Sequence, residues 1–281
     1  YVDSDEAGFE NLYDFVDITG SGTSIPMGDD TRHNGLPIGF DFEYYGTTYS
    51  TLDASSNGWL SFNPQTTSSD LGNDCPVTSA NTPNTTVAAI WDDLVSQGGG
   101  FYESFTSCPY LDYGGDCFVL QWHDFRHFGN SANMDFEVIL LDDGNIVVQM
   151  LDAGPETGSG SSTGIENETG TDGLTPYCNL VGSIHNELAV AFTPPGGTVP
   201  GQGGGGNGGG EPGENGFVRN VVGLAAVIVE RTGTRLGEDI PGDEAAGMRA
   251  IPFQEINDFA FDFEGPHAPF CPGQPGAIPP Q

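Results

Sequence analysis

The stretch that decides the fold is Asp135-Phe-Glu-Val-Ile-Leu-Leu141, with Asp143-Gly144 and then Asn145-Ile-Val-Val-Gln-Met-Leu151. Both runs are rich in β-branched and other apolar residues, which are enriched in strands. The Asp-Gly pair between them tolerates the positive φ angles that a tight turn requires. This is the strongest local pattern in the chain, and it predicts a β-hairpin.

Short apolar runs between turn signals continue in both directions from this hairpin. They comprise residues 37–45, 58–62, 86–91, 117–122 and 188–192. The run at 37–45 alternates apolar and polar residues, whereas 86–91 is continuously apolar and predicts a central strand. No helical periodicity of useful length interrupts them. We therefore predict an all-β fold for residues 1–194, a β-sandwich of the jelly-roll or immunoglobulin-like two-sheet type.

The 281-residue chain is strongly acidic, with 40 Asp and Glu, six arginines, no lysine and a net charge of −34. Schiff-base and phosphate-loop lysine chemistry are thereby excluded. Nucleic-acid binding needs a basic patch that neutralises phosphates, so we expect no nucleic-acid partner. The longest nearly apolar run, residues 221–229, is too short to cross a bilayer, so we expect no membrane insertion.

A change in composition divides the chain. Residues 195–216 are rich in glycine and proline, which predicts a flexible linker. Residues 217–281 then form a predicted C-terminal β-strand extension, with an apolar run at 217–231 and alternating Phe259, Phe261 and Phe263. Two or three strands bury such faces poorly alone. The extension therefore needs a partner surface, either on its own first domain or on a neighbouring subunit.

Two motifs carry a family resemblance, Ser55-Ser-Asn-Gly-Trp-Leu-Ser-Phe62 and Trp91-Asp-Asp-Leu94. With these motifs, the chain over about residues 9–194 resembles a β-sandwich module of secreted bacterial and archaeal surface proteins, distantly similar to the nidogen-type extracellular domain. The resemblance implies an extracellular binding or structural role without catalysis. Residues after 216 show no such resemblance.

Several features indicate a secreted protein located outside the cell or on its surface. The sequence begins at Tyr1 rather than Met, as expected of a mature chain whose leader has been cleaved. Five cysteines fit an oxidising compartment better than the cytosol. Asn84-Thr85-Thr86 and Asn167-Glu168-Thr169 match the N-glycosylation sequon, a triplet that also arises by chance.

The cysteines predict disulfides, and any pairing of the five leaves one over. Cys108 and Cys117 flank a Gly-Gly loop and form the first predicted pair. Cys75 with Cys178 is the second. Cys271, in the proline-rich tail, is then free or bonded to another chain.

Asp92 and Asp93 follow the apolar run at 86–91, where carboxylates and loop carbonyls suit a calcium ion. Alternatively, these acids cap a turn at the end of a strand. Other acidic loops, such as Asp29-Asp30, offer the same ligand type. Because 40 carboxylates repel one another, we expect divalent cations to stabilise the protein.

His123 and His127 are spaced for metal binding on a helix, but their surroundings predict a strand. Ordinary hydrogen-bonding histidines are the alternative. No nucleophile motif lies in a strand–turn–helix context, so we predict that the chain is not an enzyme.

We therefore predict a secreted structural protein that self-assembles, with a filament subunit joined to other copies by strand donation through its C-terminal extension. The alternative is a cell-surface adhesion or glycan-binding module that acts as a monomer. In that case exposed aromatic residues stack on surface glycans. The candidates, which otherwise belong to the core or to turns, are Trp59, Tyr44, Tyr45 and Tyr110.

Overall fold

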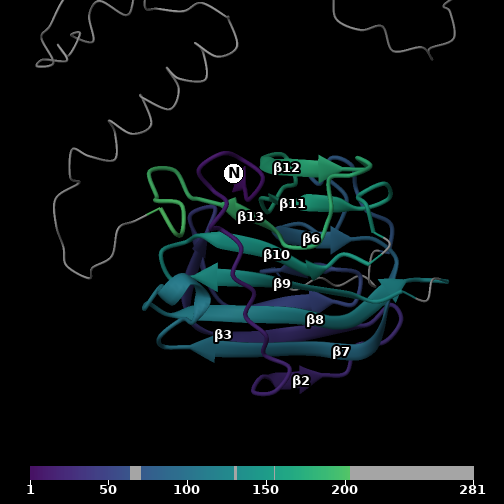
Figure 1. Cartoon of the computed structure of the whole chain (residues 1–281), viewed down its shortest axis with the longest axis horizontal. Helices are drawn as coiled ribbons and strands as arrows, with labels where there is room; N and C mark the ends of the chain where they lie inside the picture. The colour runs from purple at the N-terminus through teal and green to yellow at the C-terminus, as the bar shows by residue number, and fades with distance from the viewer. Residues whose placement is uncertain (64–70, 130–131, 155, 203–281) are drawn as a thin grey trace, which may run out of the picture. The chain divides into compact units, whose positions relative to one another are not determined.

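The computed structural model describes residues 1–63, 71–129, 132–154 and 156–202. They form two antiparallel sheets packed face to face, which confirms the predicted β-sandwich (Figure 1). The predicted C-terminal extension, residues 217–281, lies outside the described residues. Within the described residues, no helix is long and apolar enough to span a membrane.

The seven-stranded sheet has the order β1-β13-β10-β9-β8-β7-β2, and the six-stranded sheet has the order β12-β11-β6-β5-β4-β3. The strands of the first sheet, in that order, are Val2–Asp3, Leu188–Phe192, Ile146–Asp152, Met134–Leu141, Cys117–His127, Leu94–Phe105 and Thr23–Ile25. Those of the second are Gly173–Cys178, Ser162–Glu166, Thr86–Trp91, Trp59–Ser61, Thr47–Ser55 and Arg32–Tyr44. A short 3₁₀ helix, Tyr110–Asp112, precedes β8.

The predicted hairpin is the β9–β10 pair, in which Leu140 lies opposite Ile146. Gly144 has a φ of 88°, the left-handed conformation that the Asp-Gly pair anticipates. Alternate residues of both strands point into the space between the sheets, where Trp122 stacks on Phe136 with ring centroids 5.0 Å apart. The hairpin thus stands at the centre of the seven-stranded sheet.

Strand β6 is buried on both faces because a loop covers the outer face of its sheet. Val77 of this loop packs with Trp59, Ala88 and Trp91 in a separate apolar cluster. The prediction of a central strand at 86–91 is confirmed.

The outer face of the seven-stranded sheet is covered by residues 12–18, here called the N-terminal strap, which crosses β10, β9 and β8 (Figure 1). The amides of Asp14, Val16 and Ile18 donate in turn to three buried polar side chains, at distances of 2.7–2.9 Å. The acceptors are Gln149, Glu137 and Gln121, which lie opposite one another on adjacent strands. The strap therefore satisfies its backbone with side chains from the sheet.

Two disulfides tie loops to this frame. Cys108–Cys117 closes the loop that holds the 3₁₀ helix, and Cys75–Cys178 joins the loop before β6 to β12. These are the same two pairs that the sequence suggests. Cys271 lies outside the described residues.

The start of the predicted linker packs on the sandwich. The Asn145 amide donates to the carbonyl of Thr198 at 3.0 Å, and Gln202 donates to the carbonyl of Gly8 at 2.6 Å. Val199 packs against the apolar cluster beneath the strap. Residues 195–202 therefore belong with the domain rather than with a free linker.

Candidate functional site

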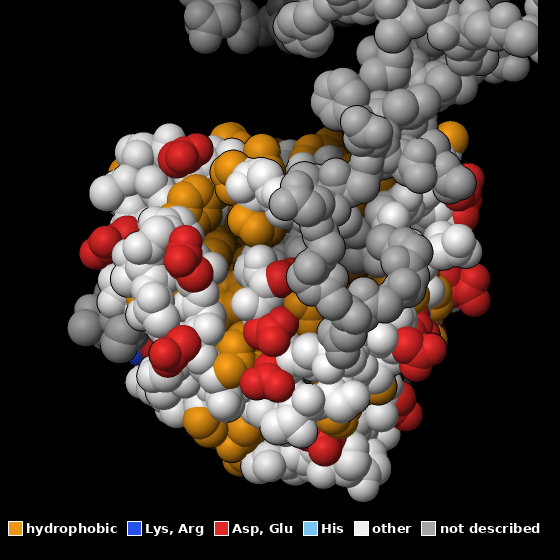
Figure 2. Space-filling model, turned by 90° about the vertical axis from the view of Figure 1, so that its left-hand side faces the viewer, with side chains coloured by type: hydrophobic (Ala, Val, Ile, Leu, Met, Phe, Trp, Pro, Cys, Tyr) orange, Lys and Arg blue, Asp and Glu red, His pale blue; other side chains and the backbone are white. Residues whose placement is uncertain are grey.

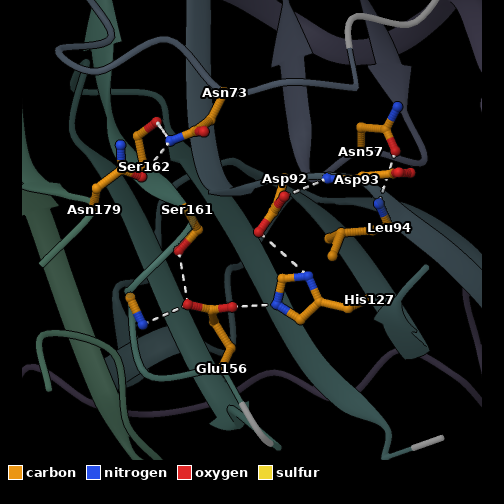
Figure 3. Close-up of polar contacts among 11 residues, drawn as sticks. Asn57, Asn73, Asp92, Asp93, Leu94, His127, Glu156, Ser161, Ser162 and Asn179 are labelled. Carbon is orange, nitrogen blue, oxygen red and sulfur yellow. Dashed lines mark hydrogen bonds and ion pairs between the residues drawn. The ribbon is translucent and has the colours of Figure 1, made fainter. Parts of the chain in front are cut away.

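Asp92 and Asp93 lie where the chain passes from β6, in one sheet, to β7, in the other. Their side chains point in different directions (Figure 3). Asp92 faces His127 and Glu156, whereas Asp93 lies with Asp29 and Asp30. The predicted calcium site at adjacent aspartates is therefore divided between two clusters, here called the histidine cluster and the aspartate cluster.

In the histidine cluster, the imidazole of His127 lies between two carboxylates. Its Nδ1 is 3.2 Å from Oδ2 of Asp92, and its Nε2 contacts Oε2 of Glu156 (Figure 3). His127 ends β8, and Glu156 lies in the loop after β10. The cluster therefore connects β6 of one sheet with β8 of the other.

Burial makes these contacts strong. The Glu156 side chain is only 3% exposed, and that of His127 is 23% exposed. Glu156 also accepts a hydrogen bond from the Ser161 hydroxyl, at 3.1 Å, and one from the amide of Gly158. Every contact around the imidazole thus favours a protonated ring.

The pKa shifts follow from this arrangement. The hydrogen bond to Glu156 raises the pKa of His127, although burial opposes it. Burial raises the pKa of Glu156, but the interactions with His127 and the hydrogen bonds from Gly158 and Ser161 together outweigh it, so the pKa lies below its usual value. The pKa of Asp92 is raised, chiefly by burial. Because each ring nitrogen has its own carboxylate, the geometry suits an imidazolium held between two acids better than a single ion bound by all three residues.

The aspartate cluster brings together carboxylate oxygens of Asp29, Asp30 and Asp93 within 4.8 Å of one another. Asn57 supports it from the Ser-Ser-Asn-Gly-Trp motif, because its side chain donates to Asp30 at 3.0 Å and accepts from the Leu94 amide at 2.9 Å. Burial, then Asp30 and Asp29, raise the pKa of Asp93. Three carboxylates without a histidine form a hard-oxygen ligand set of the kind that calcium prefers.

The two histidines singled out by their spacing do not form one site. Four residues of a strand span about 13 Å, so side chains of His123 and His127 cannot share an ion. His123 instead contacts Asp135, with Nδ1 2.5 Å from Oδ1. Both are hydrogen-bonding histidines, each with carboxylate partners.

The sequon asparagines both lie half-buried in turns. The Asn84 amide nitrogen is placed to donate to the carbonyls of Ser79 and Asn81, at 3.1 and 2.7 Å. The side-chain oxygen of Asn167 accepts from the amide of Thr171 at 3.0 Å. Both side chains thus help to hold loops in place, and their glycosylation stays a prediction.

The aromatic residues proposed for glycan stacking are mostly in the core. Trp59, Tyr44 and Tyr110 are at most 4% exposed. They are buried because Trp59 packs under the 71–82 loop, while the Tyr44 and Tyr110 hydroxyls donate to buried carbonyls. Tyr45 alone of the four is exposed, at 43%.

Tyr45 lies at a groove of about 500 Å³, here called the end groove, at the end of the sandwich where β3, β9 and β13 finish. Figure 2 shows this end of the molecule, where apolar side chains gather in a hollow among acidic ones. The apolar lining includes Tyr45, Ile146, Ile165, Leu174, Phe192 and Pro194. Glu43 and Asp172 supply its charges, and no basic residue among those described lines it.

A family model described as NIDO related matches residues 9–192. The chain belongs to the NIDO-related family. No curated protein and no solved structure matches the chain. The nidogen-related domain and its two disulfides fit an extracellular module.

Some residues in the two clusters of this NIDO-related domain were predictable from the sequence, but their grouping was not. The predicted residues are Asp92, Asp93, His127 and the Asp29-Asp30 loop, whereas Glu156 was not predicted. Glu156 lies in a glycine-rich loop, and only its burial against His127 distinguishes it from the other acids. No sequence signal joined Asp29 and Asp30 to Asp93, which is far along the chain.

Proposed function

We propose that the protein is a secreted, non-catalytic structural protein that self-assembles into filaments. Its C-terminal extension, residues 217–281, donates a strand to the NIDO-related domain of a neighbouring copy. The observation that carries this proposal is the edge of the six-stranded sheet at β3. Among the strands that the structure describes, this strand of 13 residues pairs only with β4.

Edge strands of this length are usually blunted or covered, because their free backbone groups pair readily with another strand. Among the described residues, no second strand covers β3. Each edge of this sheet contains one proline, Pro37 in β3 and Pro176 in β12, which lacks the amide hydrogen that a ladder needs. With 13 residues against six, β3 has more backbone on either side of its proline than β12 has. The β3 edge is therefore the better acceptor.

The extension supplies a suitable donor sequence. If residues 217–231 form a strand, their sequence makes both of its faces apolar, and the sequence predicts few other strands in the extension to cover them. Strand addition satisfies the backbone of such a segment and buries its side chains at the same time. A donor and an acceptor on different parts of one chain give head-to-tail contacts, which propagate into a polymer.

We also propose that calcium binds the aspartate cluster and steadies the corner between β6 and β7. The supporting observation is the convergence of Asp29, Asp30 and Asp93. In an acidic protein, such an ion also offsets repulsion among carboxylates.

Electron microscopy of the full chain and of a chain ending at residue 210 tests the proposed function. We expect ordered filaments of the full chain. The shortened chain should give dispersed particles, since residues 1–202 contain the complete sandwich. Filaments of both chains alike would show that the extension is not the donor.

A second candidate is a monomeric adhesion module that binds surface glycans. The observation in its favour is Tyr45, an exposed aromatic ring beside Glu43 and Asp172, because sugars are bound by ring stacking and carboxylate hydrogen bonds. A glycan array probed with the wild type and with Tyr45→Ala tests it. Binding that Tyr45→Ala abolishes would favour this candidate.

A further inference from the structure

The end groove combines apolar lining with negative charge. Tyr45 and Leu174 are 43% and 40% exposed, so their apolar surface is available to a ligand. Glu43 and Asp172 are exposed beside them. The pKa of Tyr45 is raised to about 12 by burial and by the nearby Asp172 and Glu166, in keeping with a negative potential there. The groove therefore fits an apolar ligand that carries positive charge.

The chain itself contains a segment of this description. Residues 217–235 read FVRNVVGLAAVIVERTGTR, which holds Arg219, Arg231 and Arg235 against the single acid Glu230. The remaining residues of this segment are mostly apolar. No separate stretch of equal length in this acidic chain has a net positive charge.

We propose that the end groove is the docking site for residues 217–235 of a second copy of this chain. Apolar side chains of the segment occupy the groove, and the two arginines at its C-terminal end, Arg231 and Arg235, lie beside Glu43 and Asp172. The inference rests on the proposed function and names the place where the donated segment is anchored. The groove is continuous with the open edge, because Glu43 and Tyr44 end β3 and also line the groove.

A charge exchange between groove and segment tests this pairing in the full chain. One variant carries Glu43→Arg and Asp172→Arg, and the other carries Arg231→Glu and Arg235→Glu. Each variant alone brings like charges together, so we expect its midpoint concentration for assembly to rise about tenfold or more, equivalent to about 1.4 kcal/mol. An equimolar mixture restores opposite charges at every junction and should assemble near the wild-type concentration, as measured by light scattering and sedimentation.

The matched control is Glu6→Arg with Glu187→Arg, two exposed acids outside the groove. This control makes the same change in net charge as the groove variant and should leave the midpoint concentration for assembly unchanged. Groove and segment variants that assemble as the wild type does would overturn the docking site while leaving self-assembly intact. A wild-type chain that stays monomeric at all concentrations would instead overturn the proposed function, and the second-copy pairing with it.

Discussion

The outer face of the seven-stranded sheet and the end groove differ in what covers them. Both place apolar side chains beside carboxylates. Under the N-terminal strap, Leu12 and Ile18 are at most 2% exposed, and the strap amides bond to side chains of the sheet. At the end groove, Tyr45 and Leu174 remain more than a third exposed. The described part of the chain thus covers one surface with its own N-terminal strap and leaves the other exposed.

The largest effect is expected for a substitution on the covered face, under the N-terminal strap. Ile18→Ala removes a buried side chain and leaves a cavity, so we expect a loss of about 2–5 kcal/mol in the free energy of unfolding. Leu174→Ala, at the groove, should change it by less than about 1 kcal/mol because the side chain is exposed. Urea unfolding of both variants measures the difference. Equal losses at the two positions would remove the distinction between the surfaces.

The next effect concerns the histidine cluster, whose side chains, like those under the N-terminal strap, are largely covered by the chain itself. His127→Gln leaves Asp92 and the buried Glu156 without their cationic partner, and should cost about 1–3 kcal/mol at pH 6. The pKa of His127 is higher in the folded state than its ordinary 6.5. Its stabilisation is therefore complete below pH 6.5 and is lost as the pH rises through the raised value.

Urea unfolding of the wild type and of His127→Gln between pH 5.5 and 9 checks this expectation. The difference in the free energy of unfolding between the two proteins should decrease as the pH rises. His185→Gln is the control, since that exposed histidine pairs with an exposed Asp5 and should have little effect. A gap that widened with pH would contradict a protonated His127.

Glu137 lies beneath the N-terminal strap and provides a second test of the covered face. It is fully buried beside amides, and burial raises its pKa well above the ordinary 4.5. A carboxyl group whose pKa is raised in the folded state contributes its full stabilisation of that state below its unfolded-state pKa. The contribution is lost as the pH rises through the folded-state pKa. Glu137→Gln keeps an acceptor for the Val16 amide, so we expect a smaller loss of stability between pH 5 and 8 than in the wild type. An unchanged pH dependence would show that Glu137 is charged.

The smallest expected effect is that of calcium on the aspartate cluster. Millimolar calcium at low salt should raise the melting temperature by a few degrees, in line with about 1 kcal/mol of binding linkage. Asp93→Asn should remove most of this rise, whereas Asp152→Asn, outside the cluster, should keep it. Scanning calorimetry with calcium or a chelator provides the measurement. The same rise in Asp93→Asn would place the ion elsewhere.

The parts of the fold that were predictable carry their signal locally. The β9–β10 hairpin follows from Asp143-Gly144 and two apolar runs, and the strand at 86–91 from its unbroken apolar character. The strap was not predicted, because its amides bond to Gln121, Glu137 and Gln149, more than a hundred residues away. The strap sequence shows no alternation of apolar and polar residues. Its backbone amides bond to side chains of the sheet rather than to a neighbouring strand.

The candidate sites were predicted residue by residue but not as groups. Asp92 and Asp93 were identifiable as acids at a strand end, yet the corner between the sheets turns their side chains toward different partners. Three of the four aromatic stacking candidates proved to be core residues. Which aromatic ring is exposed depends on the loops that pack over it, and a single sequence does not show that packing.

Self-assembly through the C-terminal extension is tested most directly by sedimentation velocity over a wide range of concentration. The full chain and the chain ending at residue 210 are compared under identical conditions. The proposal predicts that the full chain sediments faster as its concentration rises, while the shortened chain remains a monomer of constant sedimentation coefficient. A full chain that remains a monomer throughout the range would contradict it.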